Sequence, residues 1–228
     1  MITTTTRADN LSKLCGGRFD VLIVGGGING AGIARDLVLR DSNLRVALVE
    51  KNHFGSGTSG RNSHLIHGGL RYLKYFDFGL VREALKERAY LLQLAPHLVE
   101  PLEFFLPLES AWERLYYRLG LTIYDLLAGA NRIGSHHPVP GGLVYFDARV
   151  QAARLVLETV LDAADRGLCS QLCVGCGSGA QWGDRAAGQP HGNQFACEAT
   201  TVIDATGAWS KASKIRLVRG SHLIYPGF

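Results

Sequence analysis

The feature that most constrains this chain is a glycine-rich turn between an apolar run and a helix-compatible segment. Val21–Val24 leads directly into the letters GGGING, and Ala31–Arg40 follows. Gly25, Gly27 and Gly30 fit the pattern G-x-G-x-x-G in a strand–turn–helix context. The first glycine permits a tight turn, the second lets a pyrophosphate approach the backbone, and the third lets helix and strand pack closely. The pattern therefore predicts a dinucleotide-binding βαβ unit.

An acidic residue supports this interpretation. A second strand, Leu44–Val49, is predicted to end at Glu50, twenty residues after Gly30. A carboxylate at this distance can accept hydrogen bonds from ribose hydroxyls. The helix N-terminus offers N–H groups and the positive end of its dipole to the phosphates. The alternative is a glycine turn that only closes a βαβ unit, and the spacing of strand, helix and acid disfavours it.

Composition and charge exclude several classes of protein. The chain has 228 residues, 46% of them hydrophobic and 19% charged, which indicates a globular protein. Its net charge is +4, but the basic residues are scattered, so nucleic acid is not an expected partner. A mildly positive balance suits an anionic substrate or cofactor.

The cellular location is predicted from the N-terminus and the cysteines. The first residues, MITTTTRADNLSKLCGG, lack the apolar core of a signal peptide, and no run of 18 apolar residues occurs. Five cysteines, an odd number, point to free thiols in a reducing compartment. We therefore expect a cytoplasmic protein whose residues 1–18 form a polar, poorly ordered lead-in.

Periodicity and turn signals predict the remaining elements. Helices are expected at 79–94, 111–128 and 149–166. The apolar stripe of the helix at 111–128 is interpreted as core, with contact to a membrane surface as the alternative. Strands are expected at 99–108, 143–146, 168–175, 194–199, 201–205 and 215–225. Residues 51–69, 131–142 and 177–193 are expected to be loops.

The loop after Glu50 contains groups that suit a flavin nucleotide. Its central part reads GTSGRNSHLIHGGLRYL from Gly57 to Leu73. Gly68 and Gly69 would let a flat ring lie close to the backbone. The short hydrogen-bonding side chains that could wrap a pyrophosphate or flavin are Thr58, Ser59, Asn62 and Ser63.

Three residues of the same loop suit substrate chemistry. Arg71 can hold a phosphate in a bidentate fork. His67 belongs to the residue type that transfers protons near neutral pH. The alternatives are that Arg71 and Tyr72 are a surface pair that caps the next helix, and that His67 is a packed histidine.

Together these motifs resemble those of a known family. The chain resembles the N-terminal part of the FAD-dependent glycerol-3-phosphate dehydrogenases, in the D-amino-acid-oxidase-like flavoprotein superfamily. The matching runs are VGGGINGAGIARD, HGGLRYL, VREALKERAYLLQLAPHL, YFDARVQAARLVLE, VIDATGAWS and IRLVRGSH, in the family's order. Departures occur at Gly60, Arg61 and His64, and Arg219 stands where the family usually has lysine.

The resemblance implies roles for particular residues. His67, Arg71 and Tyr72 would face the substrate. The residues implied to bind FAD are Gly25, Gly27, Ile28, Asn29, Gly30, Glu50, Lys51, Thr58, Ser59, Ser63, Gly68, Gly69, Thr206 and Gly207.

The fold and function follow from the same resemblance. An α/β fold is implied, with a Rossmann-like FAD-binding domain at 19–75 and 143–210. An incomplete mixed α+β substrate domain is implied at 76–142 and 211–228. The reaction would be oxidation of sn-glycerol 3-phosphate to dihydroxyacetone phosphate, with hydride transfer to flavin N5 and electrons passed to quinone or oxygen. Peripheral contact with the inner face of the membrane and a homodimer are left open.

Several alternatives remain at this point. The chain could be another flavin oxidoreductase of the superfamily, acting on an amine or a hydroxy acid. It could also be a non-catalytic FAD-binding remnant, since the family's later motifs do not occur in it and the family's members are more than twice as long. An NAD-binding protein is disfavoured by the loop after Glu50. Cys169, Cys173 and Cys176 have iron–sulfur spacing, but their predicted strand context is ordinary, so no metal is expected.

Overall fold

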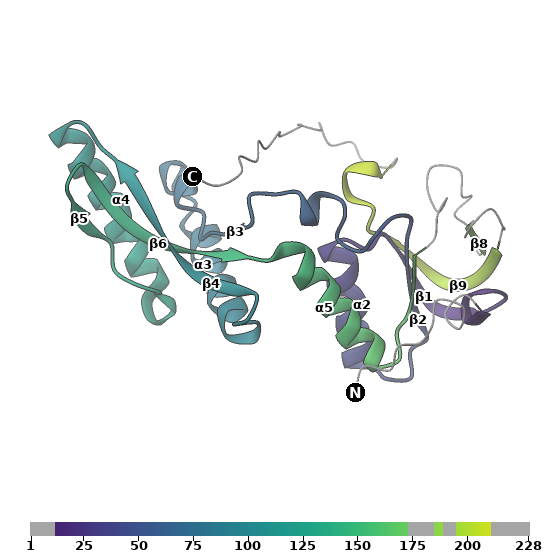
Figure 1. Ribbon diagram of the computed structural model, residues 1–228. Helices are drawn as coiled ribbons and strands as arrows, with labels where there is room; N and C mark the ends of the chain where they lie inside the picture. Colours follow the sequence, from purple (N-terminus) through teal and green to yellow (C-terminus); the bar gives the residue numbers. More distant parts are fainter. Residues whose placement is uncertain (1–11, 173–184, 189–194, 211–228) are drawn as a thin grey trace. The chain divides into compact units, whose positions relative to one another are not determined.

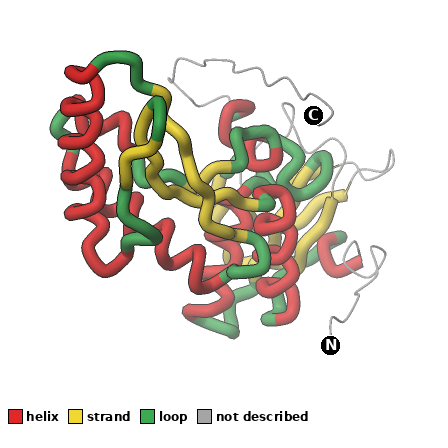
Figure 2. The backbone as a smooth tube through the Cα atoms, turned by 60° about the vertical axis from the view of Figure 1, so that its left-hand side comes forward, coloured by secondary structure: helices red, strands yellow, loops and turns green. Residues whose placement is uncertain are grey.

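The chain forms two compact units. The computed structural model describes residues 12–172, 185–188 and 195–210. The first unit comprises Met1–Asn62 and Ala152–Phe228, and the second comprises Ser63–Gln151. These bounds differ from the predicted domain bounds, because residues 65–66 and 142–150 form strands of one sheet in the second unit. Both units mix helices and strands, as the colours of Figure 2 show.

The first unit is built on a mostly parallel sheet. Its strands run in the order β7-β2-β1-β9-β8, and β8 alone is antiparallel to its neighbour. Figure 1 labels β2, β1, β9 and β8 of this sheet. In the register of β1, Val24 pairs with Val49 on one side and with Asp204 on the other. The carboxyl ends of three strands therefore meet beside the glycine turn. The strands are β1 (Arg18–Val24), β2 (Val46–Glu50), β7 (Cys169–Leu172), β8 (Arg185–Gly188) and β9 (Phe195–Asp204).

Two helices cover one face of this sheet. α2 (Ile28–Arg40) and α5 (Ala152–Asp165) lie side by side, and their buried residues share a core with Ile23 and Leu48. Strand alternation sends Leu22 to the opposite face, where it packs with Leu14. Leu14 is fully buried, so residues 12–17 differ from the poorly ordered lead-in that their polarity predicts.

The second unit carries an antiparallel sheet. Its strands run in the order β3-β6-β4, and β5 also pairs with β6. The helices contribute Leu85 of α3 and Leu121 of α4 to its core, and β6 contributes Leu143. Ser110 and Glu113 form a capping box at the start of α4. The elements are β3 (Leu65–Ile66), η2 (Leu70–Tyr75), α3 (Phe78–Leu94), β4 (Val99–Pro107), α4 (Ala111–Ala128), η3 (Gly129–Asn131), β5 (His137–Val139) and β6 (Gly142–Val150).

Most predicted helices and strands occur. The predicted helices at 79–94 and 111–128 are confirmed. The interpretation of the second helix's apolar stripe as core is wrong for Trp112, Leu115 and Leu119, which are 75%, 60% and 62% exposed. The helix predicted at 149–166 starts later, because Arg149 and Val150 pair with β4. The two strands predicted at 194–199 and 201–205 form the single strand β9, which pairs with β1. The strands predicted at 215–225 lie outside the described residues.

In the described part of the chain, no helix is both long and apolar enough to cross a membrane.

Candidate functional site

The first group of candidate residues surrounds the turn after β1. Gly25 has a φ of +112°, and a Cβ built on it would lie 2.5 Å from the carbonyl oxygen of Ala205. A Cβ on Gly30 would collide with the carbonyl oxygen of Gly25. Glycine is therefore required at both positions for the turn and for the close approach of α2. The same contacts bring Thr206, which follows β9, next to Gly25; its amide nitrogen would lie 2.9 Å from a Cβ on Gly25.

The start of α2 is bounded by a hydroxyl group. Ser59 lies in the short helix η1 (Thr58–Gly60), and its Oγ accepts a hydrogen bond of 2.9 Å from the backbone N–H of Ile28. The same Oγ is the one described atom within 4 Å of a Cβ built on Gly27, at 3.1 Å. The first amides of a helix have no partner within the helix and suit an anion. The surface of Gly27 is thus open, apart from a hydroxyl that already accepts from one of these amides.

Glu50 holds the glycine turn against the end of β2. Its Oε2 accepts from the N–H of Gly26 at 2.7 Å, and its Oε1 accepts from the N–H of Asn52 at 2.9 Å. A carboxylate has about four acceptor positions, so two backbone bonds leave capacity for hydroxyl donors.

Two further contacts lie beyond Glu50. The Lys51 ammonium lies 5.5 Å from the ring centre of Trp209, and a Cβ on Gly57 would lie 3.0 Å from the same ring. Trp209, in the short helix η4 (Gly207–Trp209), therefore packs against the loop that follows Glu50.

A carboxylate that the sequence pattern did not single out organises the turn after β9. Asp204 Oδ1 accepts from the N–H of Thr206 at 2.9 Å and from its hydroxyl at 2.5 Å. Asp204 Oδ2 accepts from the Ser210 hydroxyl at 2.6 Å. The hydroxyls of Ser210 and Thr206 hold the pKa of Asp204 below its usual range. The signal available in the sequence was an acid directly before Ala205-Thr206-Gly207.

The donor set at this edge of the first unit fits a dinucleotide. Backbone amides, a serine hydroxyl and a carboxylate meet around an open glycine surface, which suits phosphates and a ribose. Asn29 and Thr58 are exposed here, and Gly207 adopts a left-handed φ of +64°. Their roles in binding stay predictions.

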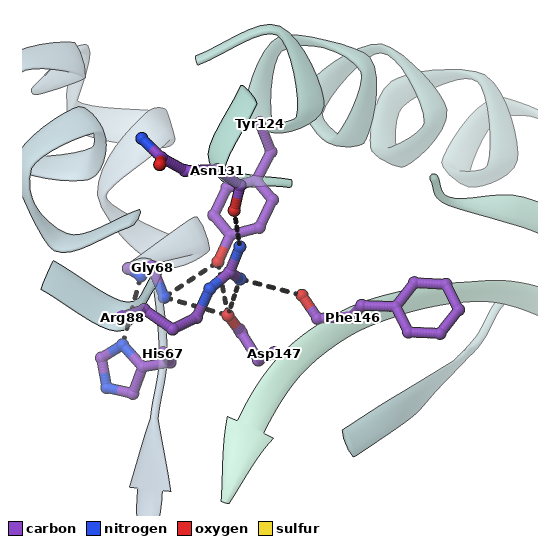
Figure 3. Close-up of polar contacts among 8 residues, drawn as sticks. His67, Gly68, Arg88, Tyr124, Asn131, Phe146 and Asp147 are labelled. Carbon is purple, nitrogen blue, oxygen red and sulfur yellow. Dashed lines mark hydrogen bonds and ion pairs between the residues drawn. The ribbon is translucent and has the colours of Figure 1, made fainter. Parts of the chain in front are cut away.

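The second group of candidate residues lies in the second unit, around Gly68 (Figure 3). The Gly68 N–H is directed at two acceptors, Tyr124 Oη at 2.9 Å and Asp147 Oδ1 at 3.1 Å. Asp147 Oδ1 also accepts from Arg88 Nη1 at 2.6 Å and from the Tyr124 hydroxyl at 2.8 Å. We call Gly68, Arg88, Tyr124 and Asp147 the Gly68 network.

The Gly68 network is buried. Arg88 and Asp147 are 1% and 2% exposed. Burial and the charge of Asp147 raise the pKa of the Tyr124 hydroxyl, which therefore stays protonated and can donate. None of the three side chains was predicted to belong to the site. The sequence signals were an acid directly after the predicted strand at 143–146 and an arginine and a tyrosine within two predicted helices.

The residues predicted to face the substrate follow this network along the chain. The Gly69 N–H donates to His67 Nδ1 at 3.2 Å, so a neutral His67 ring carries its proton on Nε2. His67 is exposed and can donate from Nε2. The Arg71 guanidinium is exposed and lies 5.3 Å from the ring centre of Tyr72.

Two remaining predictions concern Ser63 and the cysteines. Ser63 is exposed in the second unit, and its role stays a prediction. Cys173 and Cys176 of the iron–sulfur pattern lie outside the described residues.

Comparison with known proteins identifies the family. The model of the FAD dependent oxidoreductase family matches residues 20–227. A glycerol-3-phosphate dehydrogenase of Synechocystis sp. is 37% identical, over 88% of this chain and 41% of its own length. A D-erythritol 1-phosphate dehydrogenase of Brucella abortus is 35% identical, over 92% of this chain and 47% of its own length.

A solved structure also resembles this chain. The glycerol-3-phosphate dehydrogenase of Bacillus halodurans, complexed with FAD, matches with a TM-score of 0.64 and 25% identity, over 92% of this chain and 38% of the other. The chain thus spans less than half the length of these relatives. It belongs to the FAD-dependent oxidoreductase family, and its α/β architecture is that of the family's FAD-binding fold.

Proposed function

We propose that this protein takes part in the FAD-dependent oxidation of a phosphorylated polyol. The first candidate substrate is sn-glycerol 3-phosphate, oxidised at C2 to dihydroxyacetone phosphate. Two relatives named as dehydrogenases of polyol phosphates, at 37% and 35% identity, support this substrate class. Amine and hydroxy-acid substrates are less favoured, because these two relatives are named for polyol phosphates and the exposed Arg71 guanidinium suits a phosphate.

The proposal for the cofactor rests on the turn after β1. Bound FAD supplies the two-electron oxidation that protein side chains cannot perform. The amides at the start of α2 and the Ser59 hydroxyl would hold its pyrophosphate, and Glu50 would accept from a ribose hydroxyl. The contact between Ser59 Oγ and the Ile28 N–H, beside the open surface of Gly27, is the observation that carries this assignment.

The proposal for the substrate rests on the segment after Gly69. Arg71 would bind the phosphate through two parallel N–H groups, and the Tyr72 ring beside it would limit the directions that the guanidinium can take. His67 would donate from Nε2 to an oxygen of the substrate, because its Nδ1 accepts from the Gly69 N–H.

The electron acceptor is part of the same proposal. Electrons would pass to a quinone or to oxygen, as the resemblance implies. Quinone reduction would require a peripheral contact with a membrane, and a homodimer is compatible with either acceptor. Oxygen consumption, measured with and without a soluble quinone analogue, distinguishes the two acceptors.

An anaerobic reduction experiment tests the proposed function. The FAD-loaded chain is mixed with sn-glycerol 3-phosphate, erythritol phosphate, glycerol or glycine, and the flavin absorbance near ~450 nm is followed. Bleaching by the polyol phosphates but not by glycerol or glycine is expected. Bleaching by glycine alone would support the amine-oxidising alternative, and no bleaching by any of the four would support a non-catalytic FAD-binding protein.

A further inference from the structure

The Gly68 network is more elaborate than the packing of the second unit requires. Two ionised groups are buried, and removing charges from water is costly unless they are well paired and hydrogen-bonded. Apolar residues of similar size often fill such a site at no loss of stability. In the described part of the chain, Arg88 Nε is buried without a hydrogen-bond partner, and this lowers the stability that the network can contribute. Stability of the fold alone therefore does not account for the network.

The network converges on one backbone amide from three elements. Arg88 comes from α3, Tyr124 from α4 and Asp147 from β6. Tyr124 and Asp147 accept from the Gly68 N–H, and Arg88 donates to Asp147 (Figure 3). Arg88 also donates to the carbonyl oxygens of Phe146 at 3.1 Å and Asn131 at 3.4 Å, which fixes its guanidinium. The carboxylate of Asp147 is thus held in one orientation toward the Gly68 N–H.

The backbone at Gly68 cannot move toward these elements. A Cβ on Gly68 would collide with Tyr124 Oη and with the side chain of Leu85, whose Cγ would lie 2.7 Å away. Gly68 is therefore in close backbone contact with both helices. The hydrogen bonds prevent it from moving in the other direction, so its position is defined from both sides.

Backbone contacts connect Gly68 to the predicted substrate residues His67, Arg71 and Tyr72. Gly69 follows in the left-handed conformation, with φ of +73°, and its N–H donates to His67 Nδ1. Its carbonyl oxygen accepts from the Tyr72 N–H at 2.8 Å, which closes the first turn of η2. The backbone that carries Arg71 and Tyr72 thus begins at the amide that the network holds.

We propose that Arg88, Tyr124 and Asp147 are positioning residues that set the place of His67, Arg71 and Tyr72 for substrate. This inference rests on the proposed function. It adds that substrate affinity and the rate of flavin reduction depend on three buried side chains. Tyr124 and Asp147 contact the Gly68 amide directly, and Arg88 acts through Asp147. The FAD contacts proposed for the first unit should not depend on these side chains, whereas the predicted contacts of Gly68 and Gly69 with the flavin should.

Tyr124→Phe tests the inference with little change in shape. The variant keeps the ring and removes the hydroxyl that lies between Gly68 and Asp147. The matched control is Tyr117→Phe, because Tyr117 lies on the same helix, is 39% exposed and is not part of the network. Three quantities are measured in the FAD-loaded chain: the affinity for FAD, the dependence of flavin reduction on sn-glycerol 3-phosphate concentration, and amide hydrogen exchange at residues 67–73.

The inference predicts separable effects. Loss of the two buried hydrogen bonds of the Tyr124 hydroxyl, one from the Gly68 N–H and one to Asp147, should lower the second-order rate of flavin reduction about three- to tenfold in Tyr124→Phe and speed exchange at Gly68 by a similar factor. FAD affinity should change less than the rate of flavin reduction in Tyr124→Phe, because the contacts proposed for the first unit are intact, and should stay at the wild-type value in Tyr117→Phe. Asp147→Asn should have a larger effect on exchange and reduction, because the Arg88 charge then lacks its partner. If that variant does not fold, Tyr124→Phe remains decisive.

The outcomes distinguish the inference from the proposed function. Faster exchange at Gly68 with wild-type reduction kinetics would show a structural network only and would overturn the inference. Equal changes in Tyr124→Phe and Tyr117→Phe would overturn it too. A wild-type chain that binds FAD but is not reduced by polyol phosphates would refute the proposed function, and the inference with it.

Discussion

Glu50 illustrates how one side chain can serve both the fold and a ligand. Both of its carboxylate oxygens accept from backbone N–H groups, of Gly26 and Asn52. The sequence predicts a ribose contact for the same group. Both functions are compatible, because the backbone bonds hold the carboxylate at the turn while its other lone pairs remain available.

Glu50→Gln tests this double role. Glutamine keeps one acceptor oxygen, so the affinity for FAD should fall about tenfold while the fold is retained. The measurement is a fluorescence titration with FAD, together with circular dichroism of the same sample. Asp36→Asn is the control, because Asp36 pairs with Arg40 on the exposed side of α2. Surface ion pairs contribute little to stability, so this variant should keep both its fold and its FAD affinity. Unchanged FAD affinity in Glu50→Gln would limit Glu50 to a structural role.

Arg71 tests the assignment of the phosphate site. A charge-assisted contact to phosphate contributes about 1.5–3 kcal/mol, so Arg71→Ala should lower kcat/KM for sn-glycerol 3-phosphate roughly ten- to a hundredfold. The value for uncharged glycerol should change far less. Arg71→Lys should recover only part, because a point charge does not reproduce the planar fork.

The matched control for Arg71 lies in the same short helix. Lys74 is also exposed and also lies over a tyrosine ring, that of Tyr75. Lys74→Ala should leave the preference for the phosphorylated substrate unchanged. Equal losses for both substrates in Arg71→Ala would mean that Arg71 serves the flavin or the fold, and the assignment would be withdrawn.

At the scale of elements, the turn after β9 should make the stability of the protein depend on pH. The hydroxyls of Ser210 and Thr206 lower the pKa of Asp204 in the folded protein. An unfolded aspartate has a pKa of about 3.9, so this carboxylate contributes stability above that pH. The contribution is lost as the pH falls through the lower, folded-state value.

In Asp204→Asn, the free energy of unfolding should therefore depend less on pH in the acidic range than it does in the wild type. The measurement is the free energy of unfolding by urea between about pH 6 and pH 3 in the wild type and the variant. The wild type should lose more stability than Asp204→Asn over the lower part of this range. Parallel curves would show that the hydroxyl contacts of Asp204 do not persist in solution.

Some elements could be predicted from the sequence because their signals are local. Helix α4 has the bounds that its apolar spacing and the stop after Ala128 predict. The extent of β9 could not be predicted, since Thr200 and Thr201 interrupt its apolar run and the parallel partner β1 lies far away in the sequence. The start of α5 depends in the same way on the pairing of Arg149 with Glu100.

The candidate site shows the same division. The glycine turn and Glu50 could be predicted, because their spacing follows from the geometry of a βαβ unit. The Gly68 network could not be predicted, because Arg88 and Asp147 lie far apart in the sequence. Neither residue, taken alone, indicates that it is buried or which residue it pairs with. Asp204 had a local signal, its place directly before Ala205-Thr206-Gly207, but its hydrogen bonds appear only in three dimensions.

At the scale of the whole molecule, the chain combines a parallel α/β unit with an antiparallel α+β unit. The family model covers both units, while the chain spans 41% of the length of the Synechocystis relative. The glycine turn and its partners belong to the first unit, and the predicted substrate residues belong to the second. Substitutions in the glycine turn should therefore impair cofactor binding first, whereas Ser63, Gly68 and Gly69, which are also predicted to bind FAD, lie in the second unit with the predicted substrate residues.

The central claim, that the glycine turn of this chain binds FAD, is tested most directly by titration with FAD and with NAD. The wild type, Gly27→Val and Gly32→Val are compared, with circular dichroism to confirm that each is folded. Gly32 is the control, because a Cβ built on it meets no described atom within 4 Å. A valine at position 27 would occupy the space that the pyrophosphate needs, next to Ser59 Oγ. We predict that the wild type and Gly32→Val bind FAD in preference to NAD and that Gly27→Val binds neither. A folded Gly27→Val that retains FAD affinity, or a wild type that binds NAD instead, would contradict the claim.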